Sequence, residues 1–398
     1  MKALYLSALS SEQLIEELYH RNKKDPGFAV QKFNRLLVNG LVKNEVIVTV
    51  LSVPPIGRHN STRIVWHRFK ETEGAITYNY LNFINIPVFR QLCVFIGTIF
   101  RTLTWVLGEK KQNRVVVCDV LNASILAAAV LTCKITGTQI VGIMTDMPGL
   151  MVRFDQKQGI PLSTRMSTKL LKCCLANLDK YVFLTDAMNV VNKHNRPFIV
   201  MEGLCDDKMS EVVRKPEQTN IKTIMYAGGL HERYGLKKLA EAFMRLPNAN
   251  YRLLIFGSGP FAKDLTEYYC RKDSRIEYKG VIPNSEVIKA EIEASVLVNP
   301  RPTTEDFTKY SFPSKNMEYM ASGTPLLTTK LPGIPVEYYQ YIYLIEDESI
   351  EGYFRAIEST LSQSEESLIS FGAKAKEFVL KQKNNYEQAK RVIQLIKL

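Results

Sequence analysis

The sequence predicts an α/β protein made of two doubly wound domains, each with a parallel sheet between layers of helices. Short apolar, β-rich segments alternate with helical segments, and this series occurs twice along the chain. Strands covered on both faces read as continuous apolar runs, which is the pattern of both series. A length of 398 residues leaves room for two domains of about 100–200 residues each. The 46% apolar and 23% charged content excludes disorder, a collagen-like repeat and a disulfide-stapled miniprotein.

The first series predicts a domain over residues 1–203. Its expected strands are 2–7, 45–52, 114–120, 139–144 and 180–185, and its expected helices are 28–43, 88–108, 122–136 and 163–178. The apolar stretch at the start of the chain is too short for a signal peptide and fits a buried strand better.

The second series predicts a domain over residues 204–372, joined to the first by the polar stretch 205–220. Its expected strands are 222–228, 251–257, 275–280, 295–300 and 324–329, and its expected helices are 235–246, 261–271, 284–293 and 314–321. Ligands of such sheets bind beyond the carboxyl ends of the strands. We therefore expect two Rossmann-like domains that face a central cleft.

The formal charge of +12 is confined to the first half of the chain. Residues 1–200 contain 25 Lys and Arg against 13 Asp and Glu, whereas the rest contains 27 of each. This asymmetry indicates an anionic partner: nucleic acid, an acidic membrane surface or a phosphorylated substrate. Arg165, Lys169 and Lys172 form a basic stripe on a predicted helix, which favours anionic lipid headgroups. The sequence contains no helix-turn-helix pattern or aromatic-basic platform that would support nucleic acid.

Cysteine and histidine spacing predicts reduced thiols and no metal site. The seven Cys form no C-x-x-C pair and the five His have no metal-ligand spacing. Residues 88–107 are the most apolar stretch, but Arg90 and Arg101 interrupt them, so we expect no membrane-spanning helix. The wide apolar face of this helix is core, or else a peripheral membrane contact. We expect a cytosolic protein.

Two glycine-rich turns follow strands of the second domain. Gly228 and Gly229 lead into a helix with Arg233 in the loop, and Gly257 and Gly259 follow the next strand. Such turns are plain tight turns, or they let the backbone approach a phosphate at a helix N-terminus. The third glycine of a dinucleotide fingerprint is missing, so a nicotinamide cofactor is not supported.

The segment 308–329 carries the strongest signal. We expect Ser311 or Ser314 to cap a short helix that ends at Gly323. Ser314 and Lys315 suit a phosphate at the helix start. One turn further on, Glu318 can accept hydrogen bonds from two vicinal hydroxyls, such as those of a ribose.

This segment resembles the nucleotide-sugar signature of retaining GT-B glycosyltransferases of the glycosyltransferase family 4 type, including bacterial capsular and exopolysaccharide transferases. Glu318 falls on the second Glu of E-x7-E, and residues 321–325 fall on A-x-G-x-P. YAGGL resembles the diphosphate loop of the family, LIFGSGP its next strand turn, and YKGVIPNSEV, with Val281, the loop that meets the base. The four motifs occur in the family's order, and the resemblance covers nearly the whole chain.

Three positions depart from the family pattern. Tyr310 stands at the first Glu of the signature, Gly229 replaces the usual Arg of the diphosphate loop, and Tyr234 replaces its Lys. Arg233 and Lys315 are our candidates to restore the positive charge. The donor-binding set implied by the resemblance is Gly228, Gly229, Arg233, Gly257, Gly259, Val281, Ser314, Lys315 and Glu318.

The resemblance assigns the acceptor to the first domain. It implies that Asp146, at the tip of a buried strand, orients the acceptor hydroxyl or takes its proton, so Asp146 and Lys315 are the expected catalytic residues. Gly27, Lys32 and Glu202 are expected on the acceptor side; a helix cap or turn is the competing interpretation for Asp146.

The implied function is transfer of a sugar from a nucleoside diphosphate sugar, with UDP-sugar favoured, to a hydroxyl of a saccharide acceptor, which we expect to be polyprenyl-diphosphate-linked. The anomeric configuration would be retained, and no cofactor or metal would be required. We expect a cytoplasmic enzyme peripherally associated with the inner face of the cell membrane. The resemblance also implies that helix 373–398 packs back on the first domain, giving it a charge of +17 and the donor domain −5. The alternatives are a sugar-nucleotide 2-epimerase and a non-catalytic nucleic-acid-binding protein.

Overall fold

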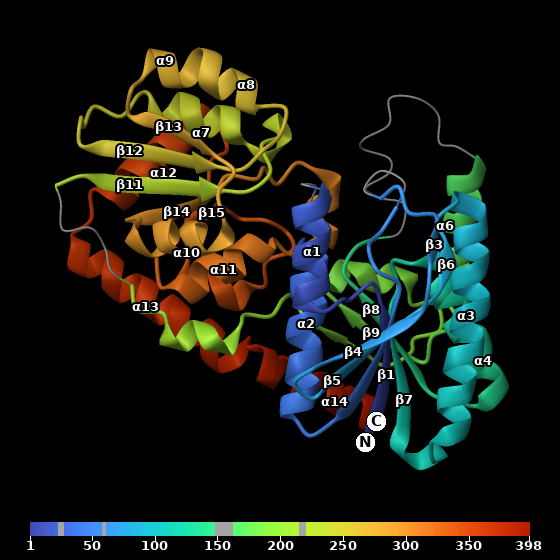
Figure 1. Cartoon of the computed structure of the whole chain (residues 1–398). Coiled ribbons are helices and arrows are strands. Elements are labelled where there is room, and N and C mark those ends of the chain that lie inside the picture. The colour runs from blue at the N-terminus through green and yellow to red at the C-terminus, as the bar shows by residue number, and fades with distance from the viewer. Residues whose placement is uncertain (23–27, 58–60, 148–161, 215–219) are drawn as a thin grey trace. The chain divides into compact units, whose positions relative to one another are not determined.

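The chain folds into two compact units in the computed structural model, which describes residues 1–22, 28–57, 61–147, 162–214 and 220–398 (Figure 1). The first unit comprises Met1–Leu204 together with Asn385–Leu398, and the second comprises Cys205–Asn384. Each unit has its own sheet and core, and each is described by itself.

An eight-stranded sheet forms the centre of the first unit, in the order β10-β9-β8-β7-β1-β2-β5-β4. The strands are β1 (Lys2–Ser7), β2 (Ile47–Ser52), β4 (Phe69–Glu73), β5 (Ile76–Tyr80), β7 (Arg114–Asp119), β8 (Ile140–Met144), β9 (Lys180–Phe183) and β10 (Phe198–Val200). Only β4 runs antiparallel to its neighbour in this sheet. The sequence analysis missed β4 and β5, and also the pair β3 (Val65–Trp66) and β6 (Phe83–Ile84), because these short segments lack a continuous apolar run.

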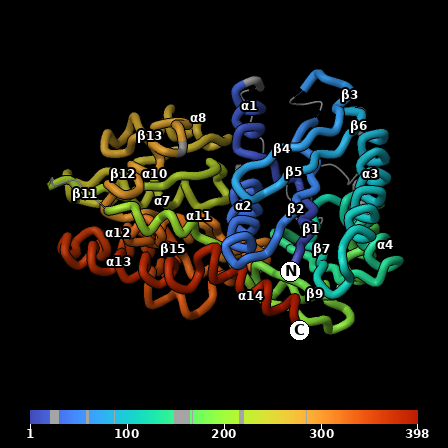
Figure 2. Tube along the Cα trace, turned by 60° about the horizontal axis from the view of Figure 1, so that its bottom comes forward, coloured from blue at the N-terminus to red at the C-terminus, as the bar shows by residue number. Residues whose placement is uncertain are grey.

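Helices cover this sheet. They are α1 (Glu12–Asn22), α2 (Phe28–Lys43), α3 (Pro87–Gly108), α4 (Ala123–Thr136), α6 (Leu162–Leu175) and α14 (Asn385–Lys397). Helices α2 and α14 pack against each other, whereas α4 packs against β7, α3 and α6. Figure 2 shows α3 and α4 side by side at the edge of this unit.

Helix α3 corrects one expectation. By length and composition alone, Val88–Gly108 is apolar enough to cross a membrane, so Arg90 and Arg101 do not disqualify it on that criterion. Only 22% of its most apolar stretch is buried inside the protein, so of the two interpretations of its apolar face, core and peripheral membrane contact, the first is wrong.

The predicted final helix is two helices. Helix α13 (Glu365–Gln382) belongs to the second unit, and only residues 385–398 join the first. Gly40 of α2 permits this docking, because a Cβ there would lie 2.0 Å from the Asn385 carbonyl oxygen. Lys180 donates to the carbonyls of Leu395 and Ile396 at 2.8 and 2.9 Å and so caps α14.

This boundary changes the distribution of charge. The first unit contains 28 Lys and Arg against 15 Asp and Glu, a net charge of +13, and the second contains 24 against 25, a net charge of −1. The expected values of +17 and −5 were wrong because residues 373–384, with a net charge of +3, stay in the second unit, and because Glu202 belongs to the first. The first unit nevertheless carries the whole excess of positive charge.

Six parallel strands form the sheet of the second unit, in the order β13-β12-β11-β14-β15-β16. They are β11 (Lys222–Ala227), β12 (Tyr251–Phe256), β13 (Ile276–Gly280), β14 (Val296–Asn299), β15 (Leu326–Thr329) and β16 (Tyr343–Ile345). The helices are α7 (Leu236–Phe243), α8 (Ala262–Asp264), α9 (Cys270–Lys272), α10 (Asn284–Glu293), α11 (Ser314–Ser322), α12 (Ile350–Leu361) and α13. This is the 3-2-1-4-5-6 order of doubly wound sheets. Successive strands are added on one side of β11 up to β13, and on its other side from β14 onward.

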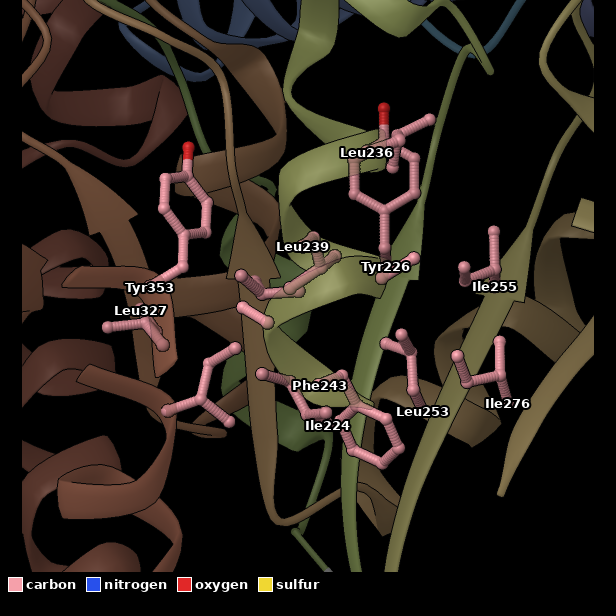
Figure 3. Packing of buried hydrophobic residues seen from close by; sticks show 14 of the residues in the cluster. Ile224, Tyr226, Leu236, Leu239, Phe243, Leu253, Ile255, Ile276, Leu327 and Tyr353 are labelled. Carbon is pink, nitrogen blue, oxygen red and sulfur yellow. The ribbon is translucent and has the colours of Figure 1, made fainter. Parts of the chain in front are cut away.

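Two apolar cores lie on the two faces of this sheet. Along β11, Ile224 and Tyr226 face a cluster built with α7 and α12, whereas Met225 and Ala227 face one built with α11 and α13. Figure 3 shows the first cluster, in which Phe243 of α7 packs over the strands. Burial on both faces explains why these strands could be predicted from continuous apolar runs.

Candidate functional site

The loops beyond β11, β12 and β13 form one hydrogen-bonded edge of the second unit. The Gly228 amide donates to Phe256 and the Gly257 amide donates to Gly280, and the Tyr278 hydroxyl donates to the Gly257 carbonyl. Tyr226 donates to the carbonyl of Gly229 at 2.8 Å, which fixes the turn after β11. The predicted glycine turns are therefore held together at the carboxyl end of the sheet.

Gly257 and Gly259 have a packing role in this edge. A Cβ on Gly257 would lie 1.9 Å from the Gly228 carbonyl oxygen, and one on Gly259 would lie 2.3 Å from that of Leu230. Their φ values of 126° and 156° are also ones that L-residues rarely adopt. Both glycines bring the second loop against the first.

Gly235 brings the loop after β11 against the end of β14. Its φ is 84°, and a Cβ would lie 1.8 Å from the Pro300 carbonyl oxygen. That oxygen also accepts a 2.6 Å hydrogen bond from Tyr353. Only glycine allows this approach without displacement of the backbone.

The close approach of Gly235 to Pro300 places Arg233 and Arg301 near the same two aromatic rings. The Cζ of Arg301 lies 4.9 Å from the ring centroid of Tyr234 and 5.4 Å from that of Phe307, and the Cζ of Arg233 lies 5.6 and 6.0 Å from the same two. The main-chain carbonyl of Arg301 accepts a hydrogen bond from Thr329. Two guanidinium groups therefore concentrate positive charge beside β11 and β14. The sequence analysis missed Arg301 because its two rings come from loops far apart in the chain.

Helix α11 is attached to the same strand ends. The Tyr319 hydroxyl accepts from the Ala227 amide at 2.9 Å and donates to the Ala227 carbonyl at 3.1 Å. Asn299, the last residue of β14, donates to Asn316 at 2.7 Å. These bonds place the start of α11 next to the loop that begins at Gly228.

The start of α11 differs from the expected capping. Pro313 occupies the N-cap position and makes no side-chain capping bond, so neither Ser311 nor Ser314 caps the helix; Ser314 is its exposed first residue. Gly323 ends the helix at a φ of 84°, as predicted. The N-terminal end of α11 therefore has no side-chain cap, and its dipole favours an anion.

Lys315 and Glu318 form an ion pair of 2.9 Å between Nζ and Oε2, with side chains 37% and 25% exposed. Burial lowers the pKa of Lys315, but the carboxylates of Glu318 and Glu291 raise it more, so the net shift is upward. Lys315 is therefore a cation, and Glu318 is oriented toward it. Glu291, buried on α10, was not predicted from the sequence.

Two other predicted positions lie on nearby loops. Val281 directly follows β13 and is 66% exposed, so its backbone can be reached by a ligand. Tyr310, at the position of the first signature Glu, ends a short 3-10 helix, Asp306–Tyr310, with the Lys309 ammonium 5.2 Å from its ring centroid.

The acceptor-side predictions lie on separate elements of the first unit. Asp146 is half-buried in the bend after β8, Lys32 is exposed on α2, and Glu202 is buried just after β10. Gly27 lies outside the described residues. Described contacts do not join these side chains into one cluster.

A buried polar network that the sequence analysis missed lies where β1 and β7 end. Tyr5 donates to Asn34 at 2.5 Å, and Asn34 donates to Asp119 at 3.1 Å, as does the Leu121 amide at 3.0 Å. Burial raises the pKa of Asp119, and the hydrogen bonds from Leu121 and Asn34 lower it less. Beside it, Gln31 donates to Ala8 and accepts from Ser10. No sequence motif signals this network, since its members come from β1, α2 and β7.

The described residues include no group of three or more His, Cys, Asp or Glu able to hold a metal ion. The second unit instead presents two arginines, a lysine, an open helix N-terminus and a carboxylate along one sheet edge. This set suits a ligand with two phosphates and vicinal hydroxyls.

Comparisons with known proteins concern the family and the fold of the chain. Residues 221–363 match the family model described as "Glycosyl transferases group 1". No curated protein sequence gives a significant match.

Solved structures resemble the whole chain. Sucrose-phosphate synthase from Thermosynechococcus elongatus is 14% identical at a TM-score of 0.67, with 100% of this chain and 98% of that chain covered. HepE from Anabaena in complex with UDP is 11% identical at 0.64, and the lipopolysaccharide outer core galactosyltransferase WaaB is 13% identical at 0.61, both with full coverage of the two chains.

The fold is GT-B, as the sequence predicts. The resemblance to GT-B glycosyltransferases is confirmed by the fold of the chain and by the family match over its second unit. Residues 221–363 are thus similar to glycosyl transferases group 1, and the whole chain shares the fold of GT-B glycosyltransferases.

Proposed function

We propose that the protein transfers a sugar from a nucleoside diphosphate sugar, UDP-sugar favoured, to a hydroxyl of a saccharide acceptor. The observation that carries this proposal is the site at the reversal point of the second sheet. There the Gly228 loop, Arg233, Arg301 and the start of α11 meet between β11 and β14. Doubly wound sheets bind nucleotides at this point.

Each donor group has a chemical partner in this site. Arg233, Arg301 and Lys315 supply positive charge for the diphosphate, and the N-terminus of α11 adds its dipole. Glu318 suits the two ribose hydroxyls, and the backbone near Val281 suits the base. Gly229 and Tyr234 lack the charge usual at these positions, and we assign it to the two arginines. Because a stabilised diphosphate leaves more easily, these cations supply much of the catalysis.

The acceptor side of the proposal rests on the first unit. Asp146 at the end of β8 orients the acceptor hydroxyl, the leaving diphosphate helps to take its proton, and attack on the same face retains the anomeric configuration. The charge of +13 on this unit favours a polyprenyl-diphosphate-linked acceptor at an anionic membrane surface, with a role in cell-surface polysaccharide synthesis.

Donor binding tests the proposal directly. Glu318→Ala, Lys315→Ala and Arg301→Gln are each expected to weaken UDP binding about 10-fold or more, since a hydrogen bond to a charged group contributes about 1.5–3 kcal/mol. Glu267→Ala is the matched control, because Glu267 belongs to an exposed pair with Lys263 on α8 and its following turn. Isothermal titration with UDP, GDP and CMP measures the affinities. Equal UDP affinity in all four variants and the wild type would remove the site assignment.

A further inference from the structure

Helix α3 is turned the opposite way from most helices of globular proteins. Its buried stripe is Val94, Thr98, Thr102 and Val106, each at most 1% exposed. The hydroxyls of Thr98 and Thr102 have no hydrogen-bond partner among the described residues. The fully buried stripe of α3 is thus half polar.

Six large apolar side chains of α3 point outward, whereas Phe95, Ile99, Leu103 and Trp105 are half-buried. The outward six are Val88, Phe89, Leu92, Ile96, Phe100 and Leu107, between 54% and 79% exposed, and the neighbouring helix α4 adds Leu131 and Ile135. We call this set the α3 face. Val88, Leu92, Ile96 and Phe100 follow an i, i+4 spacing, so they form one continuous stripe. An apolar stripe of this length on a soluble surface marks an interaction site.

Contacts on one side keep α3 parallel to the body of the first unit. Helix α3 packs along α4 and against β6, and Ser124 of α4 donates to Gln91 at 2.7 Å. Arg90 donates to the Pro54 carbonyl at 3.3 Å, and its guanidinium lies 5.1 Å from the Phe83 ring centroid. A helix held along one side cannot cross a bilayer, but its other side can lie in the interface.

The charged residues near the α3 face are basic and favour an anionic partner. Helix α3 contains no acidic residue, and α6, which packs on the other side of α4, exposes Arg165, Lys169 and Lys172. Apolar side chains beside basic ones match the acyl boundary and headgroups of an anionic bilayer. A second copy of this chain fits less well, because a symmetric dimer through the face would bring two basic units of +13 together.

We propose that the α3 face lies in the interfacial layer of an anionic lipid bilayer, with Arg165, Lys169 and Lys172 of α6 against the headgroups. This deepens the membrane part of the proposed function by naming the element that inserts. Insertion of the apolar side chains supplies most of the affinity for the bilayer. The basic residues of α6 add an electrostatic contribution to that affinity, which salt weakens.

Vesicle sedimentation of the full chain tests the proposal, with phosphatidylcholine vesicles that contain either no phosphatidylglycerol or one third. Ile96→Glu/Phe100→Glu is expected to lower the partition coefficient roughly 100-fold or more on the anionic vesicles, since each fully buried large apolar side chain adds about 10-fold or more. Lys169→Gln/Lys172→Gln is expected to bind both kinds of vesicle equally, because it loses only the extra binding that phosphatidylglycerol gives the wild type. High salt should remove the same extra binding. The matched control is Val213→Glu/Val336→Glu, two exposed apolar residues of the second unit.

The outcomes separate the alternatives. Ile96→Ser/Phe100→Ser repeats the test with smaller perturbation of the helix, and circular dichroism checks folding of every variant. Unchanged vesicle binding in both Ile96/Phe100 variants, or no binding by the wild type, overturns the proposal. A wild-type dimer in sedimentation velocity that Ile96→Glu/Phe100→Glu dissociates assigns the face to a second copy instead. UDP affinity is measured in parallel, so loss of donor binding is distinguished from loss of lipid binding.

Discussion

Replacement of Gly235 by alanine tests whether a backbone approach assembles the arginine pair. The φ of 84° costs an L-residue about 1–2 kcal/mol. In addition, the new Cβ would lie 1.8 Å from the Pro300 oxygen, so one of the two segments must move by more than an ångström. That displacement costs about 1–3 kcal/mol of overpacking, and about 1 kcal/mol for the strained Tyr353–Pro300 hydrogen bond.

Gly280→Ala is the control for the backbone term. Gly280 has a φ of 72° in the same unit, and a Cβ there would meet nothing within 4 Å. Gly280→Ala should lower the free energy of unfolding by about 1–2 kcal/mol, and Gly235→Ala should lower it by about 3–6 kcal/mol. At about 2–4 °C per kcal/mol, Gly235→Ala should melt roughly 5–15 °C below the control.

Thermal unfolding and UDP titration of both variants measure the two consequences. Gly235→Ala is also expected to weaken UDP binding more than Gly280→Ala, because the shift separates Arg233 from Arg301. Equal melting temperatures for the two variants would refute the packing argument. A lower melting temperature with unchanged UDP affinity would refute the link between this approach and donor binding.

Three further predictions concern the first unit. Burial raises the pKa of Asp119, so this group stabilises the fold at pH values below the ordinary value of 3.8, and that contribution falls as the pH rises through the raised pKa. Asp119→Asn should remove this fall in the free energy of unfolding, which urea unfolding between pH 4 and 7 measures. An equal pH dependence in both proteins would count against the prediction. Gly40→Ala should detach α14 from α2 and destabilise the unit by about 2–4 kcal/mol. Gly108→Ala is the control and should not destabilise the unit, because a Cβ there meets nothing within 4 Å. Amide hydrogen exchange in 385–397 reports the detachment. Asp146→Asn should leave UDP affinity unchanged and slow sugar transfer at least about 10-fold, and transfer at the wild-type rate would remove Asp146 from the mechanism.

The sequence predicts this fold well where burial is symmetric. Strands such as β7 and β12 are covered on both faces, and so their continuous apolar runs could be located within a residue or two. The β4–β5 hairpin escapes the same reasoning, because β4 is a partly exposed edge strand with Phe69 as its one apolar residue. The break between α13 and α14 escapes it too, since the helical pattern continues through Lys383 and Asn384 while the chain changes units there.

The site divides in the same way. Gly228, Lys315 and Glu318 belong to short motifs that carry their own local geometry, so the sequence alone identifies them as candidates. Arg301 could not be found, because its position depends on the Tyr234 ring of another loop and on the Gly235 approach to Pro300. The Asp119 network depends likewise on three elements that only the sheet order brings together.

The double hydrogen bond of Tyr319 has a consequence for motion in the second unit. Strands β11 and β14 pair only at Ile224 and Met225, so the main-chain groups of Ala227 lie beyond the shared ladder. The phenol of Tyr319 satisfies both of them and works like an extra rung between the sheet and α11. Lys315 and Glu318 therefore move with the sheet as one body. The loop that carries Arg233 and the segment after Pro300 are joined instead by a backbone approach that depends on a single glycine, Gly235.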